Sequence, residues 1–201
     1  MKQTKFNTRK MMIIAMMGAM AAILMFFELS VPLAPPFIKF DFSDLPVLIA
    51  SFLYGPLYGI ATAAIKILLK LLIKPTSTAF VGELSNFILT SLFVAIASII
   101  YRFNKTKKGA IIGMSVSTLT TSILAVFSNF FVIFPLYATM FGMTMDAIIG
   151  MVVAVNPWVK DAMTMFLFSI LPFNIFKYGV ISLITALIYK KISIVLKRYT
   201  E

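Results

Sequence analysis

One stretch of this sequence, from Ala110 to Leu136, contains no charged residue. It is longer than the roughly 20 residues that an α-helix needs to cross the hydrocarbon core of a bilayer. A transmembrane β-barrel would alternate apolar and polar side chains, and this stretch does not alternate. The composition agrees, because 61% of the residues are hydrophobic and the mean hydropathy is +1.00, beyond the range of soluble globular domains. The sequence therefore predicts an all-α integral membrane protein.

The positive charge of the chain is explained by membrane topology. A formal net charge of +11 would also suit a nucleic-acid-binding protein, but twelve of the 18 Lys and Arg residues fall in three clusters beside apolar runs. Cytoplasmic loops of membrane proteins are rich in Lys and Arg. We therefore expect no nucleic-acid partner and a cytoplasmic position for all three clusters. They are Lys2, Lys5, Arg9 and Lys10; Arg102, Lys105, Lys107 and Lys108; and Lys190, Lys191, Lys197 and Arg198.

The sequence is poorly supplied with catalytic groups. It has no Cys and no His, which removes disulfides, thiol catalysis, imidazole ligands and the commonest general base. It also has no G-x-x-x-x-G-K-[ST] motif, so it cannot bind ATP by a P-loop. We therefore expect no enzymatic activity, no metal and no cofactor.

The apolar runs predict six membrane crossings. The run that begins at Leu45 is either one helix that ends at Ile65 or two helices that break at Gly55-Pro56 and continue to Ile73. Only the split version puts all three basic clusters in the cytoplasm, so we expect six helices, cytoplasmic N and C termini and a single domain over residues 1–201. The external loops are then residues 31–43, 74–79 and 137–157. The other four spans are Met11–Leu29, Phe80–Tyr101, Ala110–Leu136 and Trp158–Tyr189.

Five polar side chains lie inside these apolar runs. A charged group at the bilayer centre costs about 2.5–3.5 kcal/mol on insertion scales unless it faces a partner or a cavity. In the six-helix topology all five can converge on one outward-facing cavity, which makes them candidates for a binding site. Alternatively, these side chains hold the bundle together by forming interhelical hydrogen bonds and a Glu83–Lys177 ion pair. The five are Glu83, Asn86, Asn129, Asn174 and Lys177.

Two periodic stripes accompany these residues. Ala15, Gly18, Ala19 and Ala22 form a smooth face on the first helix, where another backbone can approach closely, either within the bundle or from a separate membrane protein. Lys66, Lys70 and Lys74 repeat every four residues. We expect that second stripe to be mostly solvated, because lysines near helix ends snorkel to water.

Three local features complete the pattern. Asp44, followed by Pro46, is typical of a helix N-cap. The preceding loop, Val31 to Ile38, is apolar for an external segment, and a hydrophobic lid over a ligand would explain it. Pro172 interrupts the last helix and frees a backbone carbonyl in the layer of the polar residues.

Five motifs stand out along the chain: Ala15-x-x-x-Ala19, Asp41-Phe42-Ser43-Asp44-Leu45-Pro46, Gly55-Pro56-Leu57-Tyr58-Gly59, Gly82-Glu83-Leu84-Ser85-Asn86-Phe87 and Pro172-Phe173-Asn174-Ile175-Phe176-Lys177. Together with the six-helix pattern they resemble one family, the substrate-binding S components of energy-coupling factor (ECF) transporters, over nearly the whole chain. The last of the five most closely resembles the riboflavin-binding branch of this family.

The resemblance implies a multi-pass plasma-membrane protein that captures riboflavin in an outward-facing pocket. It also implies that the stripe Ala15, Gly18, Ala19 and Ala22 docks on a transmembrane T component, which two cytoplasmic ATPases drive. Two other functions remain open: an S component for another vitamin, and a self-sufficient secondary carrier with Glu83 as the coupling group. An intramembrane enzyme ranks last. The expected substrate-binding residues are Phe40, Asp44, Leu45, Glu83, Asn86, Asn129, Asn174 and Lys177.

Overall fold

The computed structural model describes residues 8–35, 38–76, 78–142 and 144–200. Within them, five helical stretches are long and apolar enough to cross a membrane, and a shorter apolar helix, α2 (Asp44–Tyr54), precedes the second of them. The expected all-α membrane architecture is confirmed. With a rise of about 1.5 Å per residue, α2 is roughly 16 Å long, about half of the hydrocarbon thickness. Lys2, Lys5, Pro36 and Phe37, which the sequence analysis used, lie outside the described residues.

Two of the long stretches are compound helices. α5 continues through a π-helical segment, η1, into α6, and α8 continues through a second π-helical segment, η2, into α9. The external loop expected over residues 137–157 contains the end of α6 and all of α7. The bounds are α1 Thr8–Met25, β1 Leu29–Ser30, β2 Lys39–Phe40, α3 Pro56–Ile73, α4 Val81–Phe103, α5 Lys107–Ser128, η1 Asn129–Ile133, α6 Phe134–Phe141, α7 Met145–Val153, α8 Ala162–Met165, η2 Phe166–Ile170 and α9 Leu171–Thr200.

The break between α2 and α3 lies where the sequence analysis placed it. Gly55 adopts φ 105° and ψ 177°, a conformation open almost only to glycine, and Pro56 begins α3. A Cβ atom at Gly55 would also lie 3.3 Å from the Arg102 guanidinium. At Gly59, a Cβ atom would lie 2.6 Å from Cβ of Ser51, so α2 and α3 pack with their backbones close together. The prediction of two helices is confirmed.

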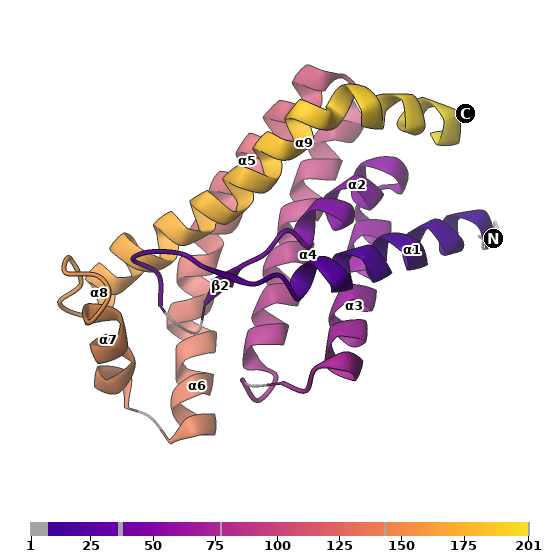
Figure 1. Cartoon of the computed structure of the whole chain (residues 1–201). Helices are drawn as coiled ribbons and strands as arrows, with labels where there is room; N and C mark the ends of the chain where they lie inside the picture. Colours follow the sequence, from indigo (N-terminus) through magenta and orange to yellow (C-terminus); the bar gives the residue numbers. More distant parts are fainter. Residues whose placement is uncertain (1–7, 36–37, 77, 143, 201) are drawn as a thin grey trace, which may run out of the picture.

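The helices pack into one bundle. α4 packs against α5, α5 against α9, and α1 against α3. At the centre, the rings of Phe93 and Tyr178 stack with centroids 4.5 Å apart. The start of α1 and the end of α9 lie at one end of the bundle, and α6, α7 and α8 lie at the other (Figure 1). An even number of crossings requires this arrangement of the two chain ends.

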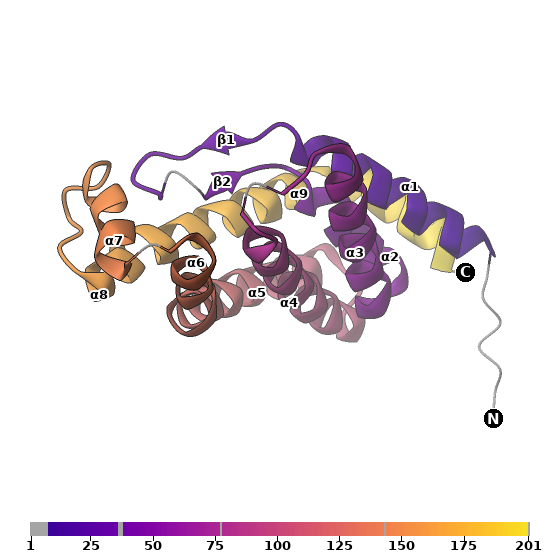
Figure 2. The same ribbon diagram turned by 90° about the horizontal axis from the view of Figure 1, so that it is seen from below.

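The apolar loop before α2 folds back as a short hairpin. β1 pairs with β2 in antiparallel register, and Figure 2 shows the hairpin lying along α9. Ala34 and Phe40 pack against Phe173 of α9. The Leu33 carbonyl accepts hydrogen bonds from Ser169 Oγ at 2.6 Å and from Asn156 Nδ2 at 3.1 Å. The loop is therefore fixed to α9 and to the segment after α7.

Pro172 does not interrupt the last helix, contrary to expectation. It lies in the first turn of α9, directly after η2. Because proline has no N–H, the Phe168 carbonyl lacks its usual helical donor four residues later. This carbonyl accepts a hydrogen bond from Asn156 Nδ2 at 2.9 Å, and Phe168 does not line the cavity described below. The freed carbonyl therefore serves the packing of the external segment.

Candidate functional site

A cavity of about 390 Å³ lies between the hairpin and the helical segments α3, α4, η1, α6 and α9. Its size is in the range of small-molecule sites. All five polar residues that the sequence analysis picked out of the apolar runs line it: Glu83, Asn86, Asn129, Asn174 and Lys177. Apolar wall comes from Met25, Ile38, Leu89, Ile133 and Phe173, with Tyr137 and Tyr178.

Two buried asparagines present their carbonyl oxygens to this cavity. Asn129 Nδ2 donates to the Ala125 carbonyl at 2.7 Å, and Asn174 Nδ2 donates to the Ile170 carbonyl at 2.8 Å. Each bond reaches back one turn along the same helix, so the amide nitrogen is held against the backbone. Asn129 begins η1 and Asn174 follows η2. The free oxygens can accept hydrogen bonds from a ligand.

Lys177 is buried and pairs with Asp44, not with Glu83. Its Nζ lies 3.2 Å from Asp44 Oδ2. Asp44 Oδ1 accepts hydrogen bonds from Lys66 at 2.7 Å and from Thr90 Oγ1 at 2.8 Å. Asp44 itself is fully buried and does not line the cavity. Its predicted role as a side-chain N-cap is wrong, because Ser43 stands at the N-cap and the carboxylate is used by these partners.

The lysine stripe on α3 is mostly buried, which contradicts the expectation of a solvated stripe. Lys66 and Lys70 have exposed fractions of 0% and 6%. Burial is tolerated because each ammonium has a carboxylate partner, Asp44 for Lys66 and Glu83 for Lys70. Lys74, at the end of α3, is exposed as expected.

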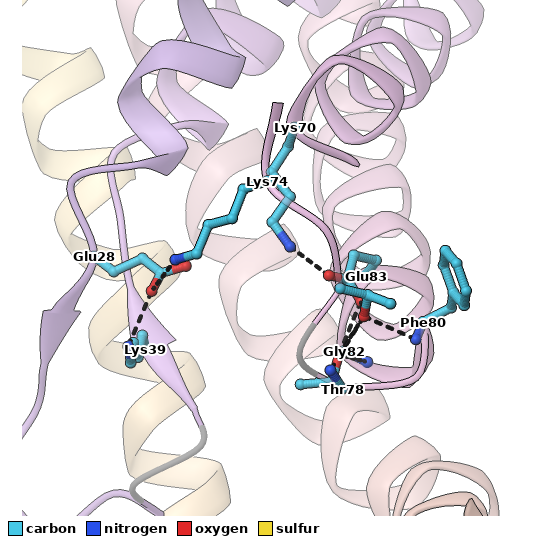
Figure 3. A network of polar contacts seen from close by, with 9 residues as sticks. Glu28, Lys39, Lys70, Lys74, Thr78, Phe80, Gly82 and Glu83 are labelled. Carbon is cyan, nitrogen blue, oxygen red and sulfur yellow. Dashed lines mark hydrogen bonds and ion pairs between the residues drawn. The ribbon is translucent and has the colours of Figure 1, made fainter. Parts of the chain in front are cut away.

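Glu83 is held by three donors at the external end of α4. Lys70 Nζ donates to Oε1, and Thr76 Oγ1 and Thr78 Oγ1 donate to Oε2 at 2.9 Å and 2.8 Å. Figure 3 shows Lys70 reaching across from α3 to this carboxylate, with Thr78 on its other side. The carboxylate lines the cavity with its charge already compensated.

A second set of charges ties the hairpin to α3. Glu28 Oε2 lies 3.0 Å from Lys39 Nζ on β2 and 3.8 Å from Lys74 Nζ at the end of α3 (Figure 3). Glu28 and Lys39 line the cavity on the hairpin side. The hairpin therefore forms one wall of the cavity, in accord with a lid.

Two other expected substrate-binding residues lie outside the cavity wall. Phe40 is buried edge-on between Phe42 and Phe176, with ring centroids 4.8 Å and 5.5 Å away. Leu45 packs against the main core. The cavity instead uses residues the sequence analysis did not select, among them Asp41, Lys70 and Tyr137. Asp41 stood in the Asp41-to-Pro46 motif, which could have singled it out. Tyr137 carried no such signal, because it lies at the start of an expected external loop.

Comparison with known proteins assigns the chain to a family. Residues 9–189 match the family described as "ECF transporter, substrate-specific component". The chain belongs to this family of S components. An S component is a membrane-embedded transporter subunit and not an enzyme, as the sequence predicted. Among the described residues, no group of three or more His, Cys, Asp or Glu side chains could hold a metal ion.

Individual relatives match this S component along most of its length. The riboflavin transporter RibU of Staphylococcus aureus (strain TCH60) is 33% identical over 96% of this chain and 94% of its own. The riboflavin transporter FmnP of Bacillus subtilis (strain 168) is 30% identical over 92% of this chain and 93% of its own. A solved structure of the S component of a bacterial ECF transporter superposes with a TM-score of 0.73 at 32% identity, covering 94% of this chain and 98% of that one.

The small-residue stripe of this S component is divided between two environments. Gly18 and Ala22 are buried, and a Cβ atom at Gly18 would lie 2.5 Å from Ile65 Cγ2 on α3. Ala15 is exposed and Ala19 is half-buried. Half of the stripe therefore serves packing inside the bundle. The other half remains accessible to a second membrane protein.

Proposed function

We propose that this S component captures riboflavin in the cavity and delivers it through a T component driven by two cytoplasmic ATPases. The observation that carries the proposal is the lining of the cavity. Four hydrogen-bonding side chains, Asn86, Asn129, Asn174 and Lys177, face the same space as an apolar and aromatic wall. The names of relatives that are 30–33% identical point to the same ligand.

The chemistry of riboflavin suits this lining. Its flat ring system is apolar on both faces and can lie against Ile38, Leu89 and Phe173, which take the part expected of Phe40 and Leu45. The imide N–H of the ring requires an acceptor, such as the Asn129 oxygen. The ribityl hydroxyls both donate and accept, and they suit Asn174 and Lys177.

The charges at the cavity favour an uncharged ligand. Lys39, Lys70 and Lys177 line it, and each lies within 4.0 Å of a carboxylate oxygen, of Glu28, Glu83 and Asp44 respectively. The carboxylates in the lining are Glu28, Glu83 and Asp41, and Asp41 accepts a hydrogen bond from the Ser43 N–H. The lining therefore holds three positive and three negative side chains and offers no net charge to match a charged ligand. Riboflavin is neutral at physiological pH and can bind while all three pairs persist.

A self-sufficient secondary carrier is less well supported. In that mechanism Glu83 would have to take up and release a proton during each cycle. Glu83 accepts hydrogen bonds from Lys70, Thr76 and Thr78, and all of these interactions stabilise the charged form. Transport in vesicles that contain this chain alone tests this mechanism directly. The proposed function predicts no riboflavin transport in such vesicles.

Binding of the flavin is tested on the purified protein. Riboflavin absorbs visible light, so protein purified from cells grown with riboflavin should be yellow and show the flavin spectrum. Titration of ligand-free protein should quench flavin fluorescence at a stoichiometry of one. A colourless preparation that leaves flavin fluorescence unchanged in titration would refute riboflavin as the ligand, and the same titration with other vitamins would then identify the alternative.

A further inference from the structure

Lys66 lies behind the cavity wall at the junction of three helices. It is fully buried on α3 and does not line the cavity. Its Nζ donates to Asp44 Oδ1 at 2.7 Å, to Asn86 Oδ1 at 2.8 Å and to Ser43 Oγ at 3.1 Å. The three N–H bonds of the ammonium are therefore all used. Neither the family match nor the names of the relatives assigns this residue a role.

The contact with Asn86 fixes the direction of that amide. An ammonium only donates hydrogen bonds, so Asn86 must present its carbonyl oxygen to Lys66. Thr90 Oγ1 lies 3.3 Å from the same oxygen. The Nδ2 group is directed away from Lys66, and Asn86 is part of the cavity wall. Lys66 thereby makes Asn86 a hydrogen-bond donor toward the cavity.

The contact with Asp44 fixes the direction of Lys177. Lys66 and Thr90 both donate to Oδ1 of Asp44, which leaves Oδ2 facing Lys177 Nζ at 3.2 Å. Oδ2 has no other partner among the described residues, so this one oxygen holds the ammonium of Lys177 at the cavity wall. The contact uses at most one of the three N–H groups of Lys177, and the others remain available to a ligand.

We propose that Lys66 is a positioning residue for ligand binding. From outside the cavity, it orients two donors toward the ligand, Asn86 Nδ2 directly and Lys177 Nζ through Asp44. Donors that are fixed before binding lose less conformational entropy when the ligand arrives, which raises affinity. The identity of the ligand rests on the proposed function. The alternative is that Lys66 only joins α2, α3 and α4 and has no effect on the direction of these groups.

A double-mutant cycle on the full-length protein separates these roles. Lys66→Met keeps the apolar stem and removes the charge, and Lys177→Met removes one of the oriented donors. Each single substitution should weaken riboflavin binding about 12- to 150-fold in a fluorescence titration, as expected for loss of a charge-assisted bond. In the Lys66→Met background, Lys177→Met should weaken riboflavin binding by less than about a further threefold, since the effects of substitutions in one network are not additive. Lys108→Met, an exposed lysine on α5, serves as the control.

The two proposals fail in different ways. If the wild-type protein binds no riboflavin, the proposed function is wrong. If it binds riboflavin and the effects of Lys66→Met and Lys177→Met multiply, or Lys66→Met binds normally, the positioning role alone is wrong.

A second variant covers the case in which Lys66→Met does not fold. Asn86→Asp keeps an oxygen toward Lys66 and strengthens that contact, but replaces the Nδ2 donor with an oxygen. The positioning role predicts at least tenfold weaker riboflavin binding with an unchanged unfolding temperature of the ligand-free protein. Unchanged affinity would overturn the proposal, because it would mean that Asn86 Nδ2 donates no hydrogen bond to the ligand. Lys66 would then only join helices.

Discussion

Replacing Lys177 with methionine gives the most direct test of the binding site. The substitution removes the ammonium and retains a side chain of similar length, so little new space is created. Asp44 keeps its hydrogen bonds from Lys66 at 2.7 Å and Thr90 at 2.8 Å, so no buried charge is left unpaired. We therefore expect a folded protein whose unfolding temperature stays close to that of the wild type.

The loss should appear in ligand affinity. A hydrogen bond to a charged group is worth about 1.5–3 kcal/mol, which corresponds to a dissociation constant roughly 12- to 150-fold higher. Titration of flavin fluorescence with purified Lys177→Met measures this directly. Lys160→Met, which removes an exposed lysine near α8, is the control and should bind normally. If Lys177→Met binds riboflavin within twofold of the wild type, Lys177 is a structural residue and its assignment to the ligand is wrong.

Further substitutions test the topology, the partner surface and the helix break. Cysteines introduced singly at Lys107 and Tyr199 should resist an impermeant thiol reagent in intact cells, and labelling of Lys107→Cys from outside would restore a five-helix topology. Ala15→Trp should abolish riboflavin uptake and copurification of the T component while riboflavin binding persists. Gly18→Leu should instead destabilise the fold by forcing α1 away from α3. An Ala15→Trp variant that still copurifies the T component would contradict docking through this face. Gly55→Ala should lower the free energy of unfolding by about 1–3 kcal/mol in denaturant titrations, because alanine cannot adopt its backbone conformation without strain.

Features that depend on a few adjacent residues were predictable from the sequence. The break at Gly55-Pro56 is one example, since glycine and proline act on the local backbone. The positions of the basic clusters then indicated that the apolar run from Leu45 contains two helices. The five polar residues in apolar runs were also found correctly as neighbours in space, because a polar group in hydrocarbon must face something polar.

Features that depend on tertiary pairing were not predictable. Lys66 and Lys70 were expected to be solvated, and the sequence could not reveal their burial, because their partners Asp44 and Glu83 lie on other helices, 22 and 13 residues away in the chain. The same limitation applies to Phe40, where hydrophobicity predicted burial but could not distinguish burial against α9 from contact with a ligand. The division of the α1 stripe likewise depends on which side of α1 faces α3.

The amide of Asn156 links the external segments to the helix that carries the binding residues. Its Nδ2 donates to the carbonyl of Leu33 in the hairpin loop, and to the Phe168 carbonyl and Ser169 hydroxyl in η2. If the loop lifts to admit a ligand, the Leu33 carbonyl loses its bonds from both Asn156 and Ser169. Protection from hydrogen exchange in the loop and in η2, which ends four residues before Asn174, should therefore change together when the site is filled.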